Sequence, residues 1–319
     1  MVIASVGFQS NWFEVLQADF MRNALVGGSI VAIAAGLLGY FVIVRQHAFA
    51  AHALAHIGFP GATGAVLIGV PVTLGLAVFT VAGALAIGFL GKKLVDREIA
   101  TGTILAFATG LGVLFNSLAT RNANAVTNVL FGNLLAISSD QLVVFAIFTL
   151  GLGVVIAMVA RPLAFASLNA DVAEAKGLPV RALGVTFMVL LALVITMAVQ
   201  VVGTLLLFGL VVTPSATALA ITARPFRVGL VGTGIGLISV LGGLVLSTMF
   251  NLPPSFFIVT ISFLIWGVTL VATRERGHVD GGSSTETDAA AAEERPGPIV
   301  AATATASATA TATASEGRI

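Results

Sequence analysis

Residues 20–46 read FMRNALVGGSIVAIAAGLLGYFVIVRQ, and this stretch decides the fold. Between Arg22 and Arg45 no side chain is charged, so the uncharged part covers the 22 residues from Asn23 to Val44. A helix of about twenty apolar residues crosses the hydrocarbon core of a bilayer. The stretch therefore predicts a transmembrane helix.

Hydrophobic stretches of similar length recur as far as Thr273. Of the 319 residues, 58% are hydrophobic and 9% are charged, whereas a soluble domain carries about 25% charged residues. Lipid offers backbone groups no hydrogen-bond partner, so helices are the expected spanning element. A transmembrane barrel would show segments of about ten residues with alternating polarity, and the sequence has none. We expect spans at about 23–44, 50–70, 71–91, 100–119, 140–160, 183–201, 203–222, 228–249 and 255–273.

The run from Leu183 to Thr222 is too long for one spanning helix. A split near Gln200 and Gly203 gives nine spans, whereas one bent helix followed by a half-span gives eight full spans. The predicted fold is therefore an all-α polytopic membrane protein with eight or nine transmembrane helices.

Lysine and arginine in short loops predict the orientation, because cytoplasmic loops carry an excess of these residues. Placing the loop after the first span inside puts eleven basic residues inside and only Arg22 and Arg121 outside. This bias requires an odd number of spans. It predicts an external N-terminus and a cytoplasmic C-terminus in a multi-pass protein of the cell membrane.

The composition divides the chain into three parts. Residues 1–22 form an external N-terminal segment without the basic region and cleavage site of a signal peptide, and residues 23–273 form the transmembrane domain. Residues 274–319 hold mainly Gly, Ser, Thr, Ala and Glu, so we expect a disordered cytoplasmic tail. The net charge of +1 gives no reason to expect a nucleic-acid partner, and the absence of cysteine excludes thiolate metal ligands.

Three of the four histidines lie in the string RQHAFAAHALAHIGFPG, residues 45–61. In a helix, His52 and His56 stand at i and i+4 on one face, where two imidazoles can converge on one divalent cation. His47 lies on the opposite side and marks the cytoplasmic boundary of the span. The alternative is that both histidines hydrogen-bond neighbouring helices. Because ionisable groups inside a membrane usually face a functional path, the two interpretations are evenly balanced at this point.

Two absences bear on the energy source. No Asp or Glu lies in the hydrophobic interior of a predicted span, and proton- or sodium-driven transporters often use such carboxylates. The sequence also has no Gly-x-x-x-x-Gly-Lys-Ser/Thr loop, so it cannot bind ATP through a P-loop. If transport is driven by ATP, another polypeptide supplies the nucleotide-binding domain.

The longest polar interruption between spans is SLNADVAEAKGLPVRALG, residues 167–184. Asn169 or Asp171 can cap a short helix, and Gly177 with Pro179 ends it. Such a helix on the inner face can dock onto a soluble partner. From spacing alone an ordinary connecting loop is the simpler interpretation.

Several strings together resemble the ABC-3 family of permeases, the membrane subunits of bacterial zinc, manganese and iron importers. Six strings occur in the family's order and cover about residues 20–260. They are residues 20–46, HALAHIGFPG (52–61), LFGNLLAIS (130–138), RPLAFASLNADVAEAKGLPV (161–180), QVVGTLLLFGLVVTPSATA (200–218) and GLVLSTMFNLPPSFFIV (243–259).

The resemblance implies roles for particular residues. The family's second span usually reads Asp-Ala-x-Ser-His, with the Asp and His implicated in metal coordination. His56 matches the family His, His52 replaces the Asp, and Ala55 replaces the Ser. Imidazole in place of carboxylate favours zinc over manganese. The resemblance also implies that the 167–184 segment contacts the ATPase, and we expect Asp171, Glu174, Ala175 and Gly177 to take part.

The expected protein is therefore a permease, not an enzyme, with no permanently bound cofactor and a transported divalent metal ion, zinc being favoured. The implied partners are an ABC ATPase subunit, an extracytoplasmic metal-binding protein, a second permease copy in a homodimer, and membrane lipid. Two rivals remain at this stage. One is a proton-coupled or passive metal transporter without an ATPase, and the other is a membrane scaffold with structural histidines.

Overall fold

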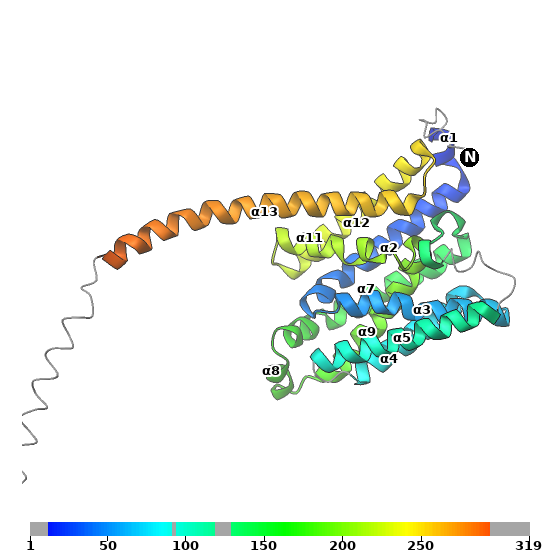
Figure 1. The fold of residues 1–319 in the computed structure, drawn as a ribbon, viewed down its shortest axis with the longest axis horizontal. Helices are drawn as coiled ribbons and strands as arrows, with labels where there is room; N and C mark the ends of the chain where they lie inside the picture. Colours follow the sequence, from blue (N-terminus) through cyan, green and yellow to red (C-terminus); the bar gives the residue numbers. More distant parts are fainter. Residues whose placement is uncertain (1–11, 91–93, 119–128, 294–319) are drawn as a thin grey trace, which may run out of the picture. The chain divides into compact units, whose positions relative to one another are not determined.

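The computed structural model describes residues 12–90, 94–118 and 129–293 (Figure 1). Within these residues every regular element is helical and no strand is present. This confirms the all-α prediction. The elements are α1 (Trp12–Gln17), α2 (Asp19–Val44), α3 (Ala48–Ile68), α4 (Val72–Leu90), α5 (Leu94–Leu118), η1 (Leu134–Ala136), α7 (Ser139–Leu168), α8 (Ala170–Ala175), α9 (Val180–Val202), α10 (Leu207–Val211), α11 (Thr213–Ile221), α12 (Pro225–Phe250) and α13 (Pro254–Glu293).

Eight of the described helices are long and apolar enough to cross a membrane: α2, α3, α4, α5, α7, α9, α12 and the part of α13 up to Thr273. The predicted span 203–222 is not one helix. It is broken into α10 and α11, which together form a shorter apolar segment, Leu207–Ile221. The backbone of Gly203, with φ 85° and ψ 168°, ends α9 before this segment. Pro214 lies in the first turn of α11, directly after the break between α10 and α11.

The α10–α11 segment nevertheless runs from one end of the helix bundle to the other. Helices α2 and α12 run in opposite directions, because Gly36 faces Thr233 and Gly28 faces Val240. Gly203 packs against Gly132 at the end where α2 begins, whereas Ser215 of α11 contacts Gly39 near the end of α2. In the described part of the chain, the eight long helices and the α10–α11 segment therefore alternate in direction.

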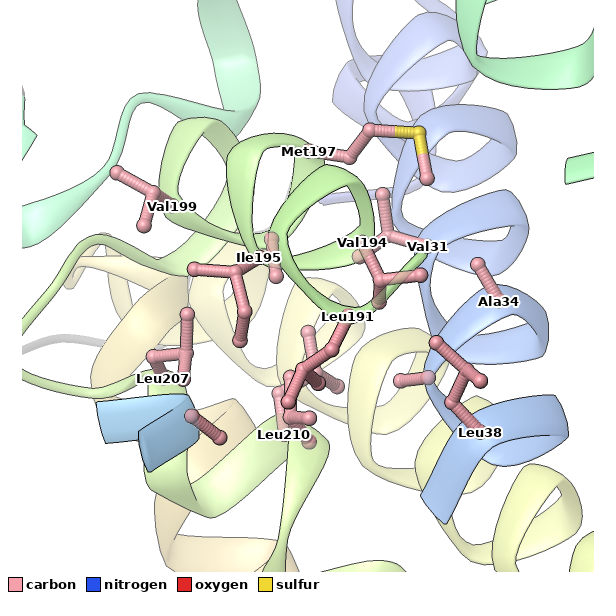
Figure 2. Packing of buried hydrophobic residues seen from close by; sticks show 14 of the residues in the cluster. Val31, Ala34, Leu38, Leu191, Val194, Ile195, Met197, Val199, Leu207 and Leu210 are labelled. Atoms are coloured by element: carbon pink, nitrogen blue, oxygen red, sulfur yellow. The ribbon is translucent and has the colours of Figure 1, made fainter. Parts of the chain in front are cut away.

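The core lies where α9 packs between α2 and α10. Thirteen of the 23 residues of α9 are buried. Figure 2 shows Leu191 and Val194 of α9 together with Leu38 of α2 and Leu210 of α10. Helices that surround this core have a different surface: Ile147 and Met158 of α7 are 66% and 75% exposed. Such large exposed apolar areas indicate a surface that faces lipid or another subunit.

The Cα atoms of α3 and α4 approach closely because both helices carry glycine at the crossing. A Cβ atom on Gly61 would lie 2.1 Å from the carbonyl oxygen of Gly75. Small residues at such crossings are typical of helix pairs in membranes, where close van der Waals packing replaces the hydrophobic effect. This contact fixes the position of α3, which carries His52 and His56.

At the C-terminal end, α13 continues past Thr273 to Glu293, within the predicted tail. A helix that is already formed can be extended without a new nucleation step, and the four alanines of 289–292 favour helix. Residues 1–11 and 294–319 lie outside the described residues. The division into external segment, transmembrane domain and disordered tail stays a prediction.

Replacing Gly203 by Ala is expected to destabilise the protein. The backbone at Gly203 occupies a region essentially restricted to glycine, and a Cβ atom would lie 2.3 Å from the carbonyl oxygen of Leu130. We expect a loss of about 2–3 kcal/mol, measured as a lower melting temperature of the purified protein. Gly151→Ala on α7 is the matched control, because no atom lies within 4 Å of its added methyl group. Equal melting temperatures for the two variants would contradict the role assigned to Gly203.

Candidate functional site

The imidazoles of His52 and His56 lie side by side on α3. Their ring centroids are 4.9 Å apart and the ring planes meet at 74°. Both side chains are half-buried. The predicted proximity of these two side chains is therefore confirmed. That they bind a metal ion stays a prediction.

Around the His52–His56 pair, a ring nitrogen has no hydrogen-bond partner and a carbonyl oxygen lacks its helical donor. His52 Nδ1 is buried and has no hydrogen-bond partner. Pro60 has no N–H, so the carbonyl oxygen of His56 lacks its helical donor. No group of three or more His, Cys, Asp or Glu side chains that could hold a metal ion occurs among the described residues. Within its described residues the chain therefore offers two imidazoles and a nearby backbone oxygen, without a carboxylate.

An aromatic side chain covers His52 from the broken segment. The ring centroid of Phe208 on α10 is 6.5 Å from that of His52, with the planes at 75°. Phe208 is itself partly exposed. Sequence reasoning did not select this residue, because its closeness to His52 depends on how α10 folds back against α3.

His47 has a different environment from the other two histidines. It is 3% exposed. Its Nδ1 lies 2.7 Å from the Arg45 carbonyl oxygen, and its Nε2 lies 3.3 Å from Nη1 of Arg97. A neutral ring with Nδ1–H donating and Nε2 accepting satisfies both contacts. Because both of its nitrogens have these partners, His47 does not join His52 and His56 as a third metal ligand.

Burial and the neighbouring charges of Arg97 and Arg45 lower the pKa of His47 to about 3. Burial also lowers the pKa of Arg45, and the charge of Arg97 acts in the same direction. The His47 ring is therefore neutral throughout the physiological pH range.

The 167–184 segment forms the expected short helix, α8. Asn169 is its N-cap, and the Asn169 side chain accepts a hydrogen bond from the Val172 amide at 3.1 Å. At the other end, Gly177 has φ 80°, and the amides of Gly177 and Leu178 donate to the carbonyls of Glu174 and Ala173. These two bonds form a Schellman motif, which ends a helix sharply.

The side chains of α8 divide into a buried and an exposed group. Ala173 is fully buried, whereas Asp171, Glu174, Ala175 and Gly177 are exposed, so the four predicted residues lie on one small surface. Leu168 and Val172 are 78% and 43% exposed beside them. Sequence reasoning missed these two apolar residues, because Leu168 ends α7 and Val172 lies on α8, so no single helical pattern contains both.

At the opposite end of the bundle, Gln200 joins three elements. Its Oε1 accepts from Thr73 Oγ1 at 2.8 Å and from Gln141 Nε2 at 3.4 Å, and its carbonyl accepts from the Asn133 amide. These groups border a cavity of about 430 Å³. The LFGNLLAIS segment, residues 130–138, contains helical residues at Leu130 and Phe131 followed by the 3₁₀ turn η1.

Acidification is expected to destabilise the protein through His47. The folded state disfavours protonation of this ring, so its stabilising effect is complete above the unfolded pKa of about 6.5 and declines as pH falls toward 3. At pH 5 the loss is about 2 kcal/mol. We expect His47→Gln, which can still donate and accept, to show a smaller fall in melting temperature than wild type between pH 7.5 and 5. The same fall in both proteins would contradict this assignment.

The comparisons with known proteins agree with the geometry. The model of the ABC 3 transport family matches residues 17–273. The manganese transport system membrane protein MntC of Listeria innocua is 30% identical over 267 residues, covering 82% of this chain and 94% of the relative. The manganese import system permease protein ScaB of Streptococcus pneumoniae is 29% identical, covering 82% and 93%.

The fold also has a solved counterpart. The structure of PsaBC from Streptococcus pneumoniae in complex with Fab superposes with a TM-score of 0.73 at 25% identity, covering 82% of this chain and 94% of that chain. The family match therefore includes all eight long apolar helices, the two histidines and α8. The chain belongs to the ABC 3 transport family.

Proposed function

We propose that this chain is the membrane-spanning permease subunit of an ATP-driven importer of divalent metal ions, with zinc favoured over manganese. The observation that carries the proposal is the His52–His56 pair on α3, within a family whose members here are named as manganese transport proteins. The subunit is not itself an enzyme. ATP is hydrolysed by a separate ABC ATPase.

The metal preference is argued from the ligands. Two imidazoles 4.9 Å apart between ring centroids can each place one nitrogen at a Zn–N distance of about 2 Å after a small rotation. Neutral nitrogen ligands suit zinc, whereas manganese is better matched by carboxylate oxygen. The manganese transporters among the relatives make manganese the natural competitor in any assay.

The site is expected to hold its ion weakly. Two protein ligands and no carboxylate give little electrostatic attraction for a dication, and a transport site must release its ion. Water, or the same two histidines of a second permease copy, completes the coordination. We propose a homodimer, with the path formed between the two copies and opened alternately to each side.

The energy source acts through α8. Its exposed carboxylates Asp171 and Glu174 flank the exposed apolar side chains of Leu168 and Val172, a combination that suits docking into a groove of a soluble partner. A capped helix of defined ends transmits movement better than a flexible loop. We propose that this surface contacts the ATPase.

The basic residues set the orientation. Arg45, Arg97 and Lys176 lie at the end of the bundle where α8 is located, and the positive-inside rule makes this end cytoplasmic. The alternating direction of the helices then puts the N-terminus outside and the C-terminus inside. The opposite end, with Gln200 and its cavity, faces the extracytoplasmic metal-binding protein that delivers the ion.

Removal of either imidazole is expected to reduce zinc import. In cells that express the chain with its ATPase and binding protein, His52→Ala and His56→Ala should each lower zinc uptake by at least about tenfold, the factor expected for one lost ligand. Uptake of radioactive zinc at equal membrane abundance is the measurement. Thr103→Ala, exposed on α5, is the control.

A second substitution tests the preference for zinc over manganese. His52→Asp restores the family carboxylate and should shift the ratio of zinc to manganese uptake toward manganese. Normal zinc uptake by the double variant His52→Ala/His56→Ala would remove the metal role from both residues and leave the importer assignment standing.

Charge reversal on α8 is expected to weaken assembly with the ATPase. Asp171→Lys combined with Glu174→Lys should reduce the amount of ATPase that co-purifies with the permease, because these exposed carboxylates lie on the proposed contact surface. Asp140→Lys at the opposite end of the bundle provides a control, with the same charge change as either single substitution on α8. Equal recovery of the ATPase with both variants would argue against α8 as the docking element.

A further inference from the structure

A three-residue turn joins α2 to α3 at the end of the bundle where α8 lies. The His47 amide donates to the Val42 carbonyl at 2.8 Å and closes α2, and the Ala51 amide donates to the His47 carbonyl and starts α3. Between them Gln46 has φ 54°, a left-handed value that is uncommon for a residue other than glycine. Any movement of this turn is therefore passed directly to the start of α3.

The Arg45 side chain connects the turn to both helices that flank α8. Its Nη1 donates to Ser167 Oγ at 3.2 Å, and its guanidinium lies over the ring of Phe187 at 5.6 Å. Ser167 is in the last turn of α7, two residues before the α8 N-cap Asn169. Phe187 is on α9, the helix that follows α8. Movement of α8 must shift one or both of these contacts.

The start of α3 is held by a second set of contacts from the same turn. The Arg45 carbonyl accepts from the His47 ring at 2.7 Å and from Nη2 of Arg97 at 3.4 Å. The His47 ring also packs on Phe187, with centroids 5.2 Å apart. Arg45 thus touches α7 and α9 with its side chain, and α3 and α5 through its carbonyl group.

These contacts can exchange at small cost. Among the described side chains no carboxylate forms an ion pair with Arg45 or Arg97, and Arg45 Nε is buried without a partner. A hydrogen bond from a guanidinium to a neutral hydroxyl is weaker than a buried ion pair, whose disruption is strongly destabilising. The connection is therefore suited to rearrangement during a cycle.

We propose that Arg45 is a positioning residue that links movement of α8 to α3, so that ATPase-driven displacement of α8 moves the two histidines. His52 and His56 follow His47 by five and nine residues, which places them about 7 and 13 Å along the helix axis. This inference rests on the proposed function, because it requires an ATPase at α8 and a metal ion at α3. The Arg45–Ser167 contact then determines the number of metal ions imported for each ATP hydrolysed.

The test uses the full chain reconstituted in liposomes with its co-purified ATPase and binding protein. Zinc import and ATP hydrolysis are measured together for wild type, Arg45→Gln and Ser167→Ala. Each variant is expected to keep ATP hydrolysis within about twofold of wild type and to lower zinc imported per ATP by at least about fivefold, the factor equivalent to one hydrogen bond. Because both changes remove the same contact, the double variant should match the singles instead of multiplying their effects.

Two controls separate coupling from folding. Arg181→Gln removes an exposed positive charge near α8, and Ser117→Ala removes a hydroxyl whose hydrogen bond stays within α5. Both should keep the wild-type ratio of zinc to ATP. Arg45→Lys keeps the charge but cannot bridge Ser167 and Phe187 in the same way, so it should follow Arg45→Gln.

The outcomes are distinct. An unchanged zinc-to-ATP ratio in Ser167→Ala and Arg45→Gln, with active wild type, overturns the coupling role and leaves the importer standing. A parallel loss of zinc import, ATP hydrolysis and melting temperature assigns Arg45 to structure and likewise overturns it. Absence of zinc and manganese import by wild type overturns the proposed function, and the coupling role with it.

Discussion

Backbone groups inside a bilayer must find partners within the protein, and the arrangement of this chain depends on that constraint. The long helices meet it internally. The break after α9 does not, because a chain that leaves the helix at Gly203 frees backbone amides and carbonyls of their helical partners. The segment before η1 supplies the missing partners: the amides of Thr204 and Leu205 donate to the carbonyls of Val129 and Leu130. The broken passage is therefore possible only where these two segments meet.

The same constraint explains why the site lies where it does. Once α9 ends at Gly203, α10 folds back beside α3 and brings Phe208 against His52. On its other side, α3 is held by the close crossing of Gly61 and Gly75. A helix that is fixed on one side by small residues and on another by a broken neighbour keeps the two imidazole rings at a defined position within an apolar bundle.

Sequence patterns predicted the features that depend on neighbouring residues. Features that depend on contacts between residues far apart in the chain could not be predicted. The spans and the short α8 could be predicted, since hydrophobic length, Asn169 and Gly177 act within a few residues. The His52–His56 pair followed from i, i+4 spacing. The split near Gly203 was only one of two alternatives, because it depends on packing against Gly132, which is 71 positions away from Gly203. The Arg45 contact with Ser167 joins residues 122 positions apart and has no signature in the sequence.

The charges along α3 bear on how an ion can be held and released. The guanidiniums of Arg45 and Arg97 lie near the start of the helix, and burial together with these charges keeps His47 neutral there. The proposed ligands farther along the same helix are two imidazoles, and among the described residues no carboxylate groups with them. At the proposed site a dication would therefore be held by coordination alone, and the positive charges near the start of α3 would oppose its binding there. Weak retention is favourable in a transport path, because a displacement of α3 that separates two nitrogens is then enough to release the ion. A tighter site with carboxylates would need a larger movement, or protonation, for the same step.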